Sequence, residues 1–261
     1  MMMTDLFLKI GVCLLAGLGA GLGTGFAGLS AAAVISPMLI TFLGMDAFDA
    51  VGIALASDVL ASAVSAYTYG KNGNLDIRNG LTMMAAVLGF TVVGSWVSSR
   101  VPNATMGSFS VWMTLLLGVK FIVRPVMTTR EAMQAVSRSK RLIQSLLCGA
   151  LIGFICGFVG AGGGMMMLLI LVSVMGYELK TAVGTSVLIM SFTALTGSLS
   201  HFALGGAPDW TCLILCVGFT LLFARVAARF ANKASAATLN RATGVVLVAL
   251  GVIILGVRLF S

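Results

Sequence analysis

The chain contains 261 residues, of which 59% are hydrophobic and 9% are charged, and its formal net charge is +8. Soluble domains carry about 25% charged residues, so this composition excludes a water-soluble globule and leaves hydrocarbon as the solvent for most of the surface. The basic residues lie between apolar runs and form no patch interleaved with aromatics, which argues against nucleic-acid binding. We predict an all-α polytopic membrane protein.

Ten apolar segments follow one another along the chain. Most approach the roughly 20 residues that a helix needs to cross about 30 Å of hydrocarbon, but the second and seventh are too short at about 1.5 Å per residue. Residues 124–141 form a polar, basic linker. The predicted segments are Leu6–Ala27, Ala31–Leu43, Phe48–Tyr69, Ile77–Ser98, Ala104–Val123, Leu142–Val159, Gly162–Met175, Leu179–Ala203, Trp210–Ala231 and Ala236–Phe260.

The order of these segments repeats along the chain. A shift of 132 residues aligns Gly21–Arg78 with Gly153–Trp210 without a gap. Because the glycine, acid and Ala-Val-Gly spacing is shared, we predict two homologous halves, residues 1–123 and 142–261, joined by the linker at 124–141. The matching positions include Gly25-Phe26-x-Gly28 with Gly157-Phe158-x-Gly160, Gly44 with Gly176, Asp46 with Glu178, and Ala50-Val51-Gly52 with Ala182-Val183-Gly184.

The distribution of Lys and Arg predicts the orientation of the halves. If the short segments count as crossings, each half has five, the second half is inverted, and the basic residues divide 13 inside to 3 outside. If they do not count, the halves are parallel and the division is 10 to 6. The positive-inside rule favours the first arrangement. We therefore predict two inverted repeats with both termini outside and the linker cytoplasmic, a pattern typical of secondary transporters.

A glycine-rich break precedes the short second segment of each half. Irregular backbone at membrane depth is tolerated where it is buried in protein or lines a cavity, and the free N–H groups at a helix start suit an anion. We predict that the two breaks face each other and bind substrate, although the glycines would equally permit tight helix crossing. The predicted binding residues are Gly28, Ser30 and Ala31 in the first half and Gly160, Ala161, Gly162, Gly163 and Gly164 in the second.

Hydroxyl groups near these breaks add further candidates. Thr185 and Ser186 can donate to an anion, or bond to the carbonyl one turn back, as Ser and Thr often do within helices. Ser57, Ser62 and Ser191 belong to polar stripes at helical spacing, which either line a pathway or join helices.

Asp58 lies near the centre of the third segment, where a charged carboxylate costs about 2.5–3.5 kcal/mol on insertion scales. An acid retained at that depth usually has a task, and we predict that Asp58 accepts a proton whose movement is coupled to substrate. The alternatives are a structural, protonated acid bonded to a neighbouring helix, or an ion pair with Lys71 or Arg78.

The second half carries the pattern of a known family: Gly157-Phe158-Val159-Gly160-Ala161-Gly162-Gly163-Gly164, a short apolar run, Gly176, and Ala182-Val183-Gly184-Thr185-Ser186. This pattern, with the two-half layout and the basic linker, resembles the TauE/SafE family of sulfite and organosulfonate exporters. The first half departs from it, with Gly28-Leu29-Ser30-Ala31 in place of the glycine run and Gly52-Ile53-Ala54 in place of Gly-Thr-Ser. The resemblance implies transport of small sulfur-containing anions across the cytoplasmic membrane.

We therefore expect a secondary transporter of sulfite or organosulfonates, proton-coupled and working by alternating access. The alternatives are a passive anion channel or uniporter, and a transporter of another small substrate such as a metal cation. An enzyme finds little support, because the sequence has no nucleophile–base pair, carboxylate dyad or metal cluster. It also has no P-loop, so ATP is not expected to drive transport from this chain. No metal, cofactor or nucleic acid is expected, the partners being the anion, membrane lipid and protons, and the oligomeric state stays open. The cysteines are expected to be inert thiols at Cys13, Cys148, Cys156, Cys212 and Cys216.

Overall fold

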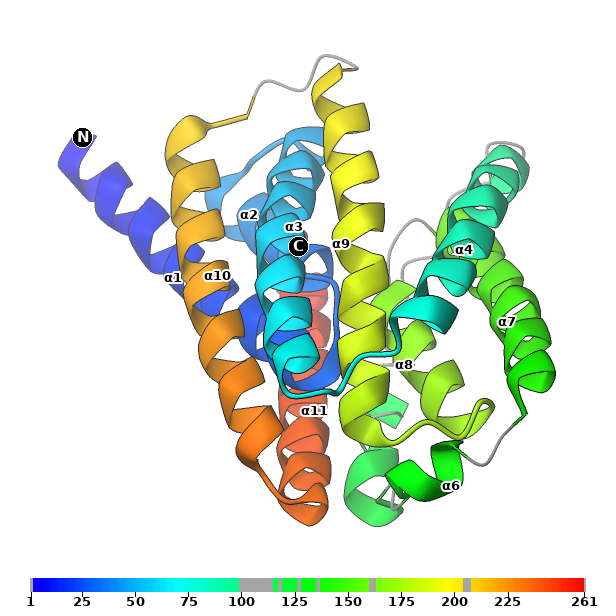
Figure 1. Cartoon of the computed structure of the whole chain (residues 1–261). Coiled ribbons are helices and arrows are strands. Elements are labelled where there is room, and N and C mark those ends of the chain that lie inside the picture. Colours follow the sequence, from blue (N-terminus) through cyan, green and yellow to red (C-terminus); the bar gives the residue numbers. More distant parts are fainter. Residues whose placement is uncertain are drawn as a thin grey trace.

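The computed structural model describes residues 2–98, 115–116, 119–125, 128–134, 137–159, 163–203 and 208–260, and the regular structure in these residues is helical (Figure 1). This confirms the all-α prediction. The helices are α1 (Met2–Ala27), α2 (Ala32–Leu43), α3 (Ala47–Lys71), α4 (Ile77–Ser98), α6 (Arg130–Gln134), α7 (Arg138–Val159), α8 (Gly163–Ser173), α9 (Leu179–Ala203), α10 (Trp210–Lys233) and α11 (Ala236–Phe260).

Within the described residues, five helices are long and apolar enough to cross a membrane: α1, α3, α9, α10 and α11. Large apolar side chains cover the outer faces of the bundle, for example Val92, Leu147 and Ile214 at 71%, 68% and 67% exposure. Such exposure is unfavourable in water and suits contact with lipid tails. The protein is a multi-pass membrane protein.

The helix bounds follow the apolar segments closely. Helices α4, α9 and α11 have the predicted bounds, and α2 and α8 are the two short helices expected after the glycine breaks. Helix α7 begins at Arg138 and not at Leu142, because Lys and Arg are good helix formers and continue the helix into the basic linker. The linker also contains the short helix α6. Most of the predicted segment Ala104–Val123 lies outside the described residues.

The same local geometry occurs at the ends of the two short helices. Gly44 follows α2 with φ +60°, and Gly176 follows α8's last turn with φ +63°, both in the left-handed region that favours glycine. The next residue in each half donates its N–H to a carbonyl of the short helix, Met45 to Leu39 and Tyr177 to Leu171. These pairs are separated by the same 132-residue shift, so the sequence repeat is also a local structural repeat.

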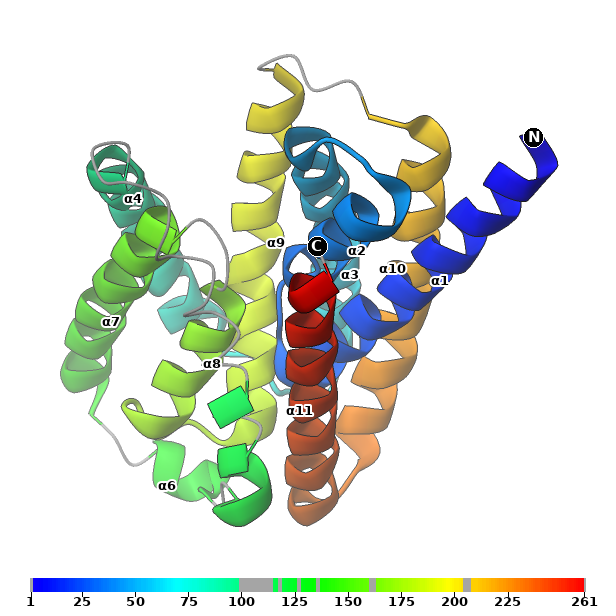
Figure 2. The ribbon, with the colours of Figure 1, turned by 180° about the vertical axis from the view of Figure 1, so that it is seen from behind.

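The two halves pack against each other through crossed pairs of helices. Helix α1 packs along α10, and α4 packs along α7. Helices α3 and α9 lie side by side between these pairs (Figure 1), and α11 packs on α1 and α2 at the opposite face (Figure 2). Gly197 of α9 lies against Leu55 near the start of α3, whereas Gly184 lies against Tyr69 near its end. Helices α3 and α9 therefore run antiparallel, as an inverted repeat requires, while the membrane orientation stays a prediction.

Candidate functional site

The first glycine break ends α1 and begins α2. Gly28 adopts φ +61°, donates its N–H to the Thr24 carbonyl at 3.0 Å, and leads into Ser30 and the N-terminus of α2. Two further carbonyls at the end of α1 are satisfied by distant helices: the Tyr69 hydroxyl of α3 donates to Gly25 at 2.8 Å, and the Thr243 hydroxyl of α11 donates to Phe26 at 3.1 Å. The break is thus fixed by hydrogen bonds, as buried backbone requires.

The first turn of α8, which follows the second break, lies directly against the first break. A Cβ placed on Gly164 of α8 would stand 2.5 Å from the Gly28 carbonyl oxygen, 2.5 Å from the Met190 sulfur and 2.9 Å from the Ser30 nitrogen. These distances are too short for a side chain, so Gly164 permits the contact. A Cβ on Gly28 would in turn overlap the Ser186 hydroxyl of α9. We call this meeting point of the two breaks the glycine crossing, and it comprises Gly28, Ser30, Asp58, Gly164, Ser186 and Met190.

Asp58 is the one acidic residue of the glycine crossing, and its side chain is fully buried. Its carboxylate accepts hydrogen bonds from the Ser30 and Ser62 hydroxyls, both at 2.7 Å, and from the backbone N–H of Ala31. The partners are therefore hydroxyl and amide donors, not Lys71 or Arg78. The carboxylate occupies the N-terminus of α2, the position where the helix dipole favours negative charge.

The other predicted residues divide between the glycine crossing and other places. Ser186 lies at the crossing and donates to the Val183 carbonyl at 2.9 Å, whereas Thr185 faces away and accepts the Asp76 N–H at 3.2 Å. Ser57 and Ser191 donate to carbonyls of their own helices, those of Ile53 and Leu188. Gly163 is the first residue of α8. Gly160, Ala161 and Gly162 lie outside the described residues.

A polar cluster around Asp76 was not anticipated from the sequence. Asp76 precedes α4, and its Oδ2 accepts hydrogen bonds from the Tyr177 hydroxyl at 2.8 Å and the Asn79 amide at 2.7 Å. Arg141 of α7 lies 3.6 Å from the same oxygen, and its guanidinium lies 5.1 Å from the Tyr177 ring centroid. The cluster joins α4 and α7, which belong to different halves.

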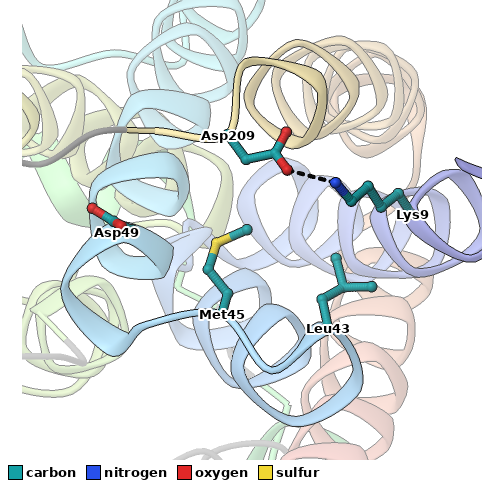
Figure 3. Close-up of a pocket in the computed structure, with 5 residues that line it drawn as sticks. All are labelled: Lys9, Leu43, Met45, Asp49 and Asp209. Atoms are coloured by element: carbon teal, nitrogen blue, oxygen red, sulfur yellow. Dashed lines mark hydrogen bonds and ion pairs between the residues drawn. The ribbon is translucent and has the colours of Figure 1, made fainter. Parts of the chain in front are cut away.

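An ion pair at the start of α10 was also missed. Asp209 caps α10 by accepting the N–H groups of Thr211 and Cys212, and it pairs with Lys9 of α1 at 2.7 Å. Burial acts to raise the pKa of the Asp209 carboxyl, but the bonds from Lys9 and the two backbone N–H groups outweigh it and hold the pKa below its ordinary value. The pair borders a cavity of about 250 Å³ lined by Lys9, Leu43, Met45, Asp49 and Asp209 (Figure 3).

Comparison with known proteins decides the family. The family model described as sulfite exporter TauE/SafE matches residues 13–254, which is nearly the whole chain. The chain belongs to the TauE/SafE family. This confirms the resemblance drawn from the glycine run and the Ala-Val-Gly-Thr-Ser motif of the second half, and with the apolar helices it makes the protein a transmembrane transporter of this family.

Several curated proteins are similar over most of their length. Probable membrane transporter protein YunE of Bacillus subtilis (strain 168) is 25% identical over 268 residues, covering 94% of this chain and 97% of that protein. Probable membrane transporter protein YdhB of the same organism is 24% identical over 216 residues, covering 81% and 86%. No solved structure matches the chain. For this TauE/SafE member, the roles of individual residues therefore rest on the geometry described above.

Proposed function

We propose that this TauE/SafE protein moves a small sulfur-containing anion, such as sulfite or an organosulfonate, across the cytoplasmic membrane by alternating access coupled to a proton. The observation that carries the proposal is the fully buried Asp58 carboxylate at the N-terminus of α2, which is bonded to Ser30, whose backbone lies against Gly164 of the second half. A buried carboxylate without a cationic partner is costly in hydrocarbon, and a proton-accepting role accounts for its retention.

Anion binding is assigned to the second break. The first N–H groups of α8 have no partners within the helix, and the helix dipole gives that end partial positive charge. At the first break the Ala31 N–H is already bonded to Asp58. The position equivalent to Asp58 in the second half is Met190, an uncharged residue at the crossing. The α8 end of the crossing therefore offers donors to an anion without a competing carboxylate.

The closeness of the two breaks suggests how proton and anion are coupled. An ionised Asp58 repels an anion at the start of α8, because two negative charges would share one weakly screened site. Protonation of Asp58 removes that repulsion. Proton binding and anion binding therefore favour each other, and the proton and the anion cross the membrane together. The protein is expected to lie in the cytoplasmic membrane with both termini outside and the linker at 124–141 inside.

The test is flux through the full-length protein in sealed vesicles. Uptake of sulfite, sulfoacetate and sulfate is measured with and without a pH gradient, for the natural sequence and for Asp58→Asn. We expect sulfite or sulfoacetate flux that rises with the gradient, and loss of this response in Asp58→Asn. Glu131→Gln, which changes an exposed acid of α6, is the control and should keep the response.

Two outcomes would contradict the proposal. Flux of a sulfur anion that ignores the pH gradient in the natural protein would identify a uniporter or channel. An unchanged gradient response in Asp58→Asn would remove Asp58 from the coupling step and leave it a structural residue.

A further inference from the structure

Two ion pairs join the halves at equivalent positions of the repeat. Lys9 of α1 and Arg141 of α7 are separated by the 132-residue shift that relates the halves. Their partners, Asp209 and Asp76, each stand immediately before the fourth helix of the opposite half, α10 and α4. Both acids also accept the backbone N–H three residues further on, at Cys212 and Asn79. The two pairs are therefore counterparts in the repeat.

The two pairs lie at opposite ends of the molecule. Met45, which borders the cavity beside Lys9 and Asp209, precedes the start of α3, and Asp76 follows its end. Because α3 has 25 residues, its ends are separated by about 37 Å at a rise of about 1.5 Å per residue. Figure 1 shows the same separation, with the start of α10 at the top and the connection from α3 to α4 in the lower half.

The two ends differ in how they are filled. Tyr177 occupies the Asp76 end: it is 1% exposed, its hydroxyl bonds to Asp76, and its ring lies beside Arg141. Its counterpart in the first half is Met45. The Met45 side chain does not fill its end of the protein and instead lines the cavity of about 250 Å³ (Figure 3). The neighbouring counterparts differ in the same way, since Leu43 lines that cavity whereas Met175 is 3% exposed.

Among the described residues, the linker forms hydrogen bonds at the Asp76 end and none at the Asp209 end. Arg141 donates a hydrogen bond to the Met133 carbonyl of α6, and Arg130 of α6 donates to the Gly73 carbonyl at 2.7 Å. The Arg141–Asp76 pair is also more buried, with side chains 9% and 16% exposed against 26% and 30% for Lys9 and Asp209. The Lys9–Asp209 atoms are closer, at 2.7 Å against 3.6 Å, but a less exposed pair is less screened by water and salt. With the added hydrogen bonds from Tyr177 and α6, the Asp76 end is held by more contacts.

We propose that Met45 and Tyr177 close the two gates of the transport path, the Lys9 gate against the Lys9–Asp209 pair and the Tyr177 gate against the Arg141–Asp76 pair. Both ion pairs are formed in the structure, which is open at the Lys9 gate and closed at the Tyr177 gate. This inference rests on the alternating access of the proposed function. In inverted repeats the two halves exchange conformations during transport. In the opposite state Tyr177 leaves Asp76, and Met45 closes over Lys9 and Asp209.

The test follows two equivalent positions at the two gates. Leu43→Cys and Met175→Cys are made separately in full-length protein whose native cysteines are replaced, and each is reacted with a membrane-impermeant maleimide in permeabilised vesicles. We expect Leu43→Cys to react at least about tenfold faster. Adding Tyr177→Phe, which removes only the hydroxyl bonded to Asp76, should accelerate Met175→Cys severalfold and slow Leu43→Cys. Thr82→Ala, which deletes a hydroxyl that donates to the Arg78 carbonyl of its own helix, is the matched control and should change neither rate.

The opposite change at the two reporters is the decisive result. If Tyr177→Phe accelerates Met175→Cys and leaves Leu43→Cys unchanged, the cluster is a local packing contact and the gate proposal is wrong. Unchanged rates at both positions overturn it as well. A second variant, Lys9→Gln, weakens the other gate and should increase the ratio of Leu43→Cys to Met175→Cys labelling, and a decrease overturns the proposal. Labelling needs no substrate, so a failure to transport sulfite leaves this test intact.

Discussion

The two glycine breaks occupy equivalent positions of the sequence repeat and differ in chemistry. In the first half the helix start is occupied by Asp58, with Ser30 and Ser62 as donors. At the equivalent positions of the second half stand Met190, Gly162 and Ala194, none of which is charged. Duplication alone would have produced two identical sites. The difference supports our proposal that the first half binds a proton and the second half binds the anion.

Placing an acid at the second break should have the largest effect. Met190→Asp would give the α8 end a carboxylate like that of Asp58, in competition with the anion. A buried charge costs about 2.5–3.5 kcal/mol, which corresponds to about 100-fold in an equilibrium. We expect sulfite flux to fall by about that factor, measured in vesicles at matched protein content, while Met190→Leu keeps most of it. Equal flux in both variants would refute the specialisation of the second half.

Separating the two breaks should have the next largest effect. In Gly164→Ala the new methyl group would collide with the Gly28 carbonyl and the Met190 sulfur. Overpacking of this kind costs about 1–3 kcal/mol, so we expect about a tenfold loss of flux and a lower midpoint of thermal unfolding in detergent. Gly218→Ala is the matched control, because a Cβ there meets nothing within 4 Å. The same effect in both variants would show that the crossing has no special role.

Removal of one donor from Asp58 should have a moderate effect. Ser62→Ala deletes one hydrogen bond to the carboxylate, a loss of about 0.5–1.5 kcal/mol, and we expect flux to fall severalfold with an altered pH profile. Ser57→Ala serves for comparison, since the Ser57 hydroxyl donates to the Ile53 carbonyl of its own helix. A pH profile that stays the same in Ser62→Ala would argue against a functional role for this bond.

The smallest effect is expected at Asp209. A carboxyl with a lowered folded pKa stabilises the fold above its ordinary pKa and loses this contribution only as the pH falls through the folded value. The Asp209 carboxyl should therefore stay ionised from about pH 5 to pH 8. Maleimide reacts with the thiolate, so the reporter is the ratio of Leu43→Cys to Met175→Cys labelling, in which the rise in thiolate with pH cancels. We expect this ratio to change less than about twofold across that range. A larger change would place a titrating group at this gate and weaken the assignment of pH sensing to Asp58.

Much of the fold could be predicted from the sequence because its signals are local. The lengths of the apolar segments predicted the bounds of α4, α9 and α11, and the glycine runs predicted where the short helices α2 and α8 begin. Asp58 was recognisable as a buried acid from its place in an apolar segment. Its partners were not, because Ser30 lies 28 residues away and meets it only through the packing of α2 on α3.

The two gates could not be predicted for a similar reason. Each joins a first helix to the fourth helix of the other half, at separations such as the 200 residues between Lys9 and Asp209. The repeat did contain a usable signal, since Lys9 and Arg141 obey its shift. Asp76 and Asp209 are displaced from that register by one residue, so a gapless alignment does not pair them. The equivalence of Asp76 and Asp209 is recognised only from the structure, in which each acid accepts backbone N–H groups at the start of its helix, α4 or α10.

The carbonyl group of Phe26 has a consequence for biosynthesis. Its hydrogen-bond partner, Thr243, belongs to α11, which the ribosome makes long after α1. Until that helix is inserted, the end of α1 keeps a buried acceptor without its native donor, at a cost of about 1–3 kcal/mol. The first half of the chain therefore cannot complete its own glycine break during translation, and loss of α11 should impair an element formed more than two hundred residues earlier.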